Sequence, residues 1–221
     1  MIVPMTVQQT TALLGPNFVS TFQSEMDSII NPLRKHIALG RPLSMGKELW
    51  EYVVSDSIVG AVWNGAGHSL IDVMITPGVG GDVKSVSYNS KSKQTTEASM
   101  YQNFDQNAKQ YFASGNKQAI WDLYVKGWFG KAHSFSKYYL IGIMREKESL
   151  DCNLCCFEVT DVVPTYSDSL FTCTNTMMHI NGLADPDFIK IRYYNSKSRM
   201  ELQFTKKCWT DPQYALPIFK F

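Results

Sequence analysis

The sequence predicts a single α/β or α+β domain in which helices flank a mixed central β-sheet. Three observations support this class: two helical stretches at 17–38 and 45–63, a glycine-linked hairpin at 69–88, and further strands after a second helical region. A chain of 221 residues with 44% hydrophobic and 13% aromatic residues is long and apolar enough to bury a full core.

The first half of the chain carries two helical patterns. Residues 17–38 are expected to form a helix that bends or breaks near Pro32. Ser44 can cap a second helix over 45–63. Its apolar residues fall on one face at ~100° per residue. They are Trp50, Val53, Val54, Ile58 and Ala61.

Strand and helix patterns then alternate to the end of the chain. Two strands joined by the turn PGVGG form the first hairpin. A polar helix over 96–115 and a shorter one over 117–128 are expected next. The remaining predicted strands cover 137–145, 154–163, 188–194 and 200–207, the last two as a second hairpin.

Composition limits the functional classes. No apolar run reaches the ~18 residues that span a bilayer, and MIVPMTVQQTTALL lacks the charged start of a signal peptide. We therefore expect no membrane partner and a cytoplasmic location. The formal net charge of +1 is lower than a nonspecific nucleic-acid coat protein usually has, but a site-specific protein can keep its basic residues local.

The cysteines permit two interpretations. Five cysteines are an odd number, which favours reduced thiols over a disulfide framework. Cys152 and Cys155 have CxxC spacing, and Cys173 with Cys208 or His179 would be needed to complete a zinc site. The second half of a zinc pattern is missing, so small buried thiols, Cys156 included, are the preferred interpretation.

The first hairpin brings charged residues together. On a strand, Asp82 and Lys84 point the same way, and pairing across the glycine turn places Asp72 near Asp82. Two carboxylates at such a short distance repel each other unless a cation lies between them. Their oxygen atoms are ligands that suit Mg²⁺. Lys84 could then position a water and neutralise charge on a phosphate. The simpler alternative is a surface ion pair between Asp82 and Lys84.

One sequence pattern resembles the core motif of the PD-(D/E)XK nucleases, the fold of most type II restriction endonucleases. It consists of Asp72, nine further residues and then Asp82-Val83-Lys84. Ile71 stands where the motif name has proline, and the resemblance covers roughly residues 44–112. It implies a restriction-endonuclease-like mixed central β-sheet flanked by helices, with Asp72, Asp82 and Lys84 as catalytic residues and Mg²⁺ as cofactor.

In that family a helix before the hairpin often supplies another acidic ligand. Glu51 lies about 100° from Trp50, at the border of the apolar face beside Ile58, whereas Glu48 lies about 160° from it. We therefore expect Glu51, with Asp72 and Asp82, to hold the metal.

A second motif could compete with the first. Pro186-Asp187 and, after thirteen residues, Glu201-Leu202-Gln203 also match a variant of the family pattern. This alternative lacks the lysine and has no glutamate-bearing helix just before it.

DNA contacts are expected from two cationic loops and a basic strip. YNSKSK at 88–93 and YNSKSR at 194–199 each follow a strand. Between Phe188 and Cys208, six basic residues stand against the single acid Glu201. Solvated loops remain the alternative. The expected DNA-binding residues are His68, Asn89, Lys91, Lys93, Asn195, Lys197 and Arg199.

The resemblance implies a Mg²⁺-dependent, sequence-specific double-stranded DNA endonuclease of the type II restriction class. Such an enzyme acts as a homodimer and has a cognate DNA methyltransferase as functional partner. Its catalytic core would cover about 44–145, and a β-rich part at about 150–221 would serve DNA recognition or dimer contacts. Two alternatives stay open: a nuclease of the same fold acting on DNA structure in repair, recombination or phage biology, and a non-enzymatic zinc-containing binding protein.

Overall fold

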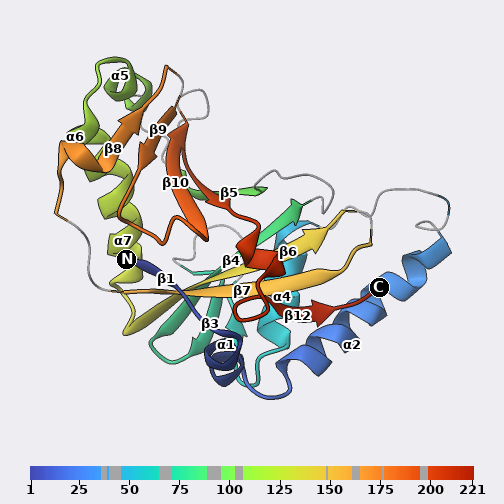
Figure 1. Ribbon diagram of the computed structural model, residues 1–221. Helices are drawn as coiled ribbons and strands as arrows, with labels where there is room; N and C mark the ends of the chain where they lie inside the picture. The colour runs from blue at the N-terminus through green and yellow to red at the C-terminus, as the bar shows by residue number, and fades with distance from the viewer. Residues whose placement is uncertain are drawn as a thin grey trace.

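Two β-sheets, sheet A and sheet B, form the frame of the molecule (Figure 1). The computed structural model describes residues 1–35, 39, 46–64, 71–88, 96–102, 107–147, 149–160, 165–175, 177–194 and 199–221. Within these residues sheet A has seven strands and sheet B has five. The fold is mixed α/β with helices against the sheets, which confirms the expected class.

Sheet A is a mixed sheet. Its strands follow the order β1-β7-β6-β4-β3-β2, and β12 pairs with the same strand as β1. Strands β4 and β6 run parallel and the other pairs run antiparallel. The bounds are β1 (Ile2–Pro4), β2 (Val62–Trp63), β3 (Val73–Thr76), β4 (Val79–Tyr88), β6 (Lys137–Glu146), β7 (Cys152–Val159) and β12 (Leu216–Phe219).

The N-terminal helices cover one face of sheet A. Helices α1 (Val7–Leu14), α2 (Phe18–Ile30) and α4 (Lys47–Asp56) belong to this layer. The apolar residues of α2 and α4 share one core with Val83 of β4. A 3-10 turn, η1 (Asn31–Leu33), follows α2, which confirms the helix break expected near Pro32.

Helix α4 is shorter than the sequence pattern predicts. It ends at Asp56, and the expected helical residues Val62–Trp63 instead form β2 at the edge of sheet A. Gly60 lies between them with φ +81°, in a turn that the hydrogen bond from the Ala61 N–H to the Ile58 carbonyl closes after the helix has ended. The expected cap, Ser44, lies outside the described residues.

The connection from β4 to β6 supplies the helices near the other face. It contains α5 (Ala108–Ala113), α6 (Lys117–Ile120), the π-helical turn η2 (Trp121–Val125) and α7 (Lys126–Ala132). The predicted helix over 117–128 is therefore confirmed. Trp121, Tyr124, Trp128 and Phe129 of this region are buried in a second core.

The expected helix over 96–115 is wrong in its first half. Residues Thr96–Gln102 form β5, which pairs with β11 of sheet B, and the helical residues among those described in this stretch are Ala108–Ala113. Pairing with a distant strand here outweighs the local helical preference of a polar sequence.

Sheet B is antiparallel, with the order β5-β11-β10-β9-β8. Strands β10 and β11 confirm the second predicted hairpin. The further elements of this region are η3 (Asp168–Leu170), β8 (Phe171–Cys173), β9 (Met177–Ile180), β10 (Ile189–Tyr194), β11 (Arg199–Phe204) and α8 (Lys207–Thr210).

The expected division into a catalytic core at about 44–145 and a β-rich part at about 150–221 does not coincide with the two sheets, because each sheet contains strands from both parts. Sheet A takes β7 and β12 from the C-terminal part, and sheet B takes β5 from the core. The second core contains residues of sheet A, sheet B and the α6–α7 region, so one apolar interior joins the two sheets. No helix of the described residues is long and apolar enough to cross a membrane.

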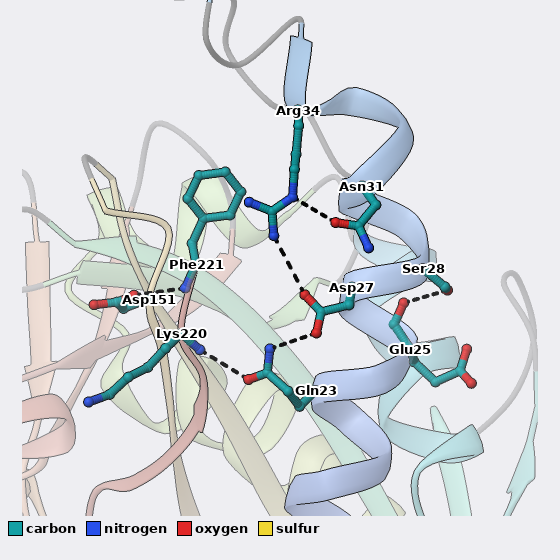
Figure 2. Close-up of polar contacts among 9 residues, drawn as sticks. All are labelled: Gln23, Glu25, Asp27, Ser28, Asn31, Arg34, Asp151, Lys220 and Phe221. Atoms are coloured by element: carbon teal, nitrogen blue, oxygen red, sulfur yellow. Dashed lines mark hydrogen bonds and ion pairs between the residues drawn. The ribbon is translucent and has the colours of Figure 1, made fainter.

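Polar contacts fix α2 against the last strand (Figure 2). The backbone N–H of Lys220 donates to Oε1 of Gln23 at 3.2 Å, and that of Phe221 donates to Oδ1 of Asp151 at 3.2 Å. The Arg34 guanidinium lies 5.0 Å from the centre of the Phe221 ring. These contacts hold the helical layer on sheet A.

Candidate active site

The charged residues of the first hairpin lie on one face of sheet A. Val83 belongs to the core under α2 and α4, whereas Val86 and Tyr88 belong to the core that contains α6 and α7. Successive side chains of a strand point to opposite faces, so Asp82 and Lys84 lie on the α6–α7 side.

Asp82 and Lys84 form a buried ion pair. The Lys84 ammonium lies 2.5 Å from Oδ1 of Asp82, and the two residues are only 8% and 1% exposed. The alternative of a surface ion pair is therefore wrong. Removing two charges from water costs several kcal/mol per ion before their attraction offsets it, so burial of such a pair is a weak source of stability. Perturbed, buried charges of this kind cluster at functional sites.

The hairpin places Asp72 beside Asp82. The backbone N–H of Asp72 donates to the carbonyl of Gly81 at 3.0 Å, and Oδ2 of Asp72 accepts from the backbone N–H of Val83 at 2.7 Å. Gly80 makes this close approach possible, because a Cβ there would lie 2.8 Å from Cγ2 of Ile71. The structure thus brings together the three residues that the strand pattern singled out.

Two further residues complete the group, and the sequence pattern did not indicate either. Lys131 of α7 places its ammonium 3.8 Å from Oδ2 of Asp82. Tyr138, at the start of β6, is buried, and its ring centre lies 5.9 Å from the Lys131 ammonium. Lys131 follows Asp82 by 49 residues, so no local spacing could have revealed the contact.

The charges of the group set its protonation. Burial alone would raise the pKa of Asp82, but the nearby Lys84 and Lys131 ammoniums, and the hydrogen bond that Lys84 donates, hold it well below its usual range. Burial, with the charges of Asp82 and Asp72, raises the pKa of Tyr138 well above its ordinary value of 10. At neutral pH Asp82 is therefore a carboxylate and Tyr138 a neutral phenol.

The group has buried polar atoms that the described residues do not satisfy. Oδ2 of Asp82 and the hydroxyl of Tyr138 are both buried without a hydrogen-bond partner in the described part of the chain. An unsatisfied carboxylate oxygen beside a second carboxylate fits Mg²⁺, which binds through one or two carboxylates and completes its shell with water and phosphate oxygens.

The third expected ligand, Glu51, belongs to helix α4. Glu51 is buried on α4 and Glu48 is exposed, which agrees with the helical positions expected from the sequence. However, α4 packs with Val83 on the face opposite Asp82 and Lys84. Among the described residues no group of three or more His, Cys, Asp or Glu side chains is placed to hold a metal.

The competing motif is divided between two ion pairs. Glu201 is fully buried and lies 3.0 Å from the guanidinium of Arg192, its neighbour across β10 and β11. Asp187 is exposed and pairs with Lys207 at 2.6 Å. Arg192 lies opposite Glu201, and Asp187 precedes Arg192 by five residues, which span about 16 Å of extended chain. The geometry therefore does not favour a shared metal ion for Asp187 and Glu201.

The cysteines are placed as core side chains. All five are free thiols, and four of them are buried, Cys173 being the exposed one. Burial raises the pKa of Cys152 and Cys156 to about 12. Thiols that resist ionisation are poor zinc ligands, because zinc binds the thiolate.

Most expected DNA contacts fall on residues that the structure does not describe. His68, Asn89, Lys91, Lys93, Asn195 and Lys197 lie outside the described residues. Arg199 begins β11, but its side chain is not described. Of the basic strip, Arg192 and Lys207 are engaged with Glu201 and Asp187. Lys190 and Lys206 are exposed.

A comparison of the chain with protein-family models, with curated proteins and with solved structures finds no match.

Proposed function

We propose that the chain is a Mg²⁺-dependent, sequence-specific double-stranded DNA endonuclease of the PD-(D/E)XK type, in the type II restriction class. The observation that carries the proposal is the buried group on one face of β3 and β4. The carboxylates of Asp72 and Asp82 and the ammonium of Lys84 lie together there. Oδ2 of Asp82 has no hydrogen-bond partner among the described residues.

Each residue has a defined task in this proposal. Asp82 and Asp72 hold the cation, and the hydrogen bond from the Val83 amide fixes the Asp72 carboxylate in place. Lys84 orients the attacking water and offsets charge that develops on the phosphate. Mg²⁺ held by these carboxylates would supply Lewis-acid activation of a water and of the phosphate. Glu51 as a third ligand stays a prediction.

The wider assignments rest on the resemblance alone. They are a homodimer that reads a palindromic site, a cognate DNA methyltransferase and a cytoplasmic location. A nuclease of the same fold that acts on DNA structure would use the same residues, so sequence preference in a cleavage assay separates the two. The zinc-containing binding protein has less support, because four of the five thiols are core side chains.

The direct test is incubation of the protein with phage DNA, with and without Mg²⁺. We expect discrete bands with Mg²⁺, no cleavage in chelator, and loss of the bands for Asp82→Asn. Asp122→Asn is the matched control, because it removes an ion-paired aspartate that lies on the surface and belongs to neither motif. Absence of cleavage on all DNA substrates, or equal cleavage by Asp82→Asn and wild type, would refute the proposal.

A further inference from the structure

The carboxylate of Asp82 lies between two lysines from different elements. Lys84 of β4 contacts Oδ1 at 2.5 Å, and Lys131 of α7 faces Oδ2 at 3.8 Å. With Asp72 beside Asp82, the two lysines together balance the charges of two carboxylates. The second lysine has no role in the mechanism described so far.

The two lysines differ in how firmly they are held. The Lys84 side chain is 9% exposed and makes a short hydrogen bond, so it is fixed within the strand. The Lys131 side chain is 20% exposed, and 3.8 Å is too long for a hydrogen bond. The Lys131 ammonium therefore attracts Asp82 by charge alone, and another cation could replace it there. Its side chain is also partly open to solvent.

Lys131 and a divalent cation would use the same oxygen. Oδ2 of Asp82 accepts no hydrogen bond from the described residues, so it is the oxygen most open to a metal. A metal there would repel the Lys131 ammonium. A displaced lysine at the edge of the site is a compact positive charge, which suits a phosphate oxygen.

We propose that Lys131 is a phosphate-binding residue of this site and that it occupies the metal position on Asp82 in the metal-free protein. When the site is loaded, Lys131 leaves Oδ2 and contacts a non-bridging oxygen of the scissile phosphate. The neutral hydroxyl of Tyr138, also without a hydrogen-bond partner in the described part, is a second donor beside it. This inference rests on the proposed nuclease function.

Metal binding without DNA provides the first test. Mn²⁺ serves as the probe, and its affinity is measured by titration calorimetry or by the electron paramagnetic resonance signal of the free ion. Loss of a competing ammonium should tighten Mn²⁺ binding to Lys131→Gln by about threefold to tenfold. A lysine that only supported the fold would leave this affinity unchanged or weaken it.

Lys126→Gln is the matched control. Lys126 lies on the same helix and is also ion-paired with an aspartate, Asp122, at 2.5 Å, but the pair is at the surface. Its substitution should leave Mn²⁺ affinity and cleavage unchanged. Thermal unfolding of both variants verifies that each is folded at the assay temperature.

Single-turnover cleavage at saturating Mg²⁺ provides the second test. Lys131→Gln should slow cleavage by about tenfold or more, the size expected for one lost contact to a charged transition state. Lys131→Arg keeps the charge and should retain more activity than Lys131→Gln. Tighter Mn²⁺ binding together with slower cleavage supports the inference.

Failure of the inference can be told from failure of the proposed function. If Lys131→Gln binds Mn²⁺ and cleaves DNA like wild type, while Asp82→Asn is inactive, Lys131 has no such role and the nuclease assignment stands. If the wild-type protein neither binds Mn²⁺ nor cleaves DNA, the proposed function is wrong, and this inference falls with it.

Discussion

The Lys84 ammonium lies 2.5 Å from the Asp82 carboxylate, two positions away on the same strand, and both side chains are almost fully buried. Neighbouring residues of a strand face commonly form ion pairs at a surface, where such pairs contribute little. Here the pair is enclosed, so stability depends on the same two charges that the proposed function uses.

Removing the carboxylate should destabilise the protein. Asp82→Ala leaves Lys84 buried without its ion-pair partner, and we expect the free energy of unfolding to fall by about 3–5 kcal/mol. Adding Lys84→Met should recover part of the loss, because no charge is then left unpaired. Urea unfolding of the two single variants and the double variant measures this. A double variant less stable than Asp82→Ala would contradict the expectation.

The same carboxylate should make stability depend on acid. The folded pKa of Asp82 is lowered, so its contribution is fully present above the unfolded value of about 3.9 and is lost as pH falls toward the folded value. The unfolding free energy should therefore decline more steeply below pH ~4 for wild type than for Asp82→Asn. Parallel curves for the two proteins would show that Asp82 is not held ionised.

Substitution of Glu201 tests whether this residue has a structural or a catalytic role. Glu201→Gln removes the charge that pairs with the buried Arg192 and should lower stability. At a temperature where the variant is folded, its Mg²⁺-dependent cleavage should match wild type. Abolished cleavage with normal DNA binding would instead identify the second motif as the catalytic centre.

Calcium should separate binding from cutting. Ca²⁺ takes similar oxygen ligands but is a poorer activator of bound water. Carboxylates without a cation should repel DNA, so Ca²⁺ should tighten cognate binding without cleavage. Asp72→Asn removes one negative charge and should bind with less help from Ca²⁺, yet stay inactive with Mg²⁺. Gel shifts in chelator and in Ca²⁺ measure this, and equal affinity throughout would exclude a bridging cation.

The cationic loop after β10 is expected to contact phosphates. Lys197→Ala should weaken binding about equally on cognate and noncognate DNA and should lower the salt slope by about one unit. Binding isotherms at several salt concentrations measure both quantities. An unchanged slope would indicate a solvated loop.

Local patterns were sufficient for the hairpin and its charges. Strand alternation and the glycine turn predicted that Asp72, Asp82 and Lys84 share one face, and the contacts agree. Helical spacing placed Glu51 at the border of the apolar face, yet spacing alone does not say which face of a sheet a helix covers. Glu51 was expected to reach the end of the sheet, and the apolar face of its helix packs with Val83, whose side chain points away from Asp82.

Long-range pairing explains the remaining differences. Lys131 and Tyr138 reach Asp82 only through the crossover to β6, whose path no local pattern specifies. The polar stretch at 96–102 has a helical composition but pairs with β11, about a hundred positions later. Such tertiary contacts override weak local preferences.

Both ends of the described chain pair with β7, β1 beside Val159–Phe157 and β12 beside Leu154–Cys152. An uncovered strand edge exposes hydrogen-bonding groups that can recruit another chain into an aggregate. β7 consists largely of apolar residues and thiols, so its edge would be a strong template for such growth. Two short segments that are far apart in the sequence therefore cover this edge and withhold it from other chains.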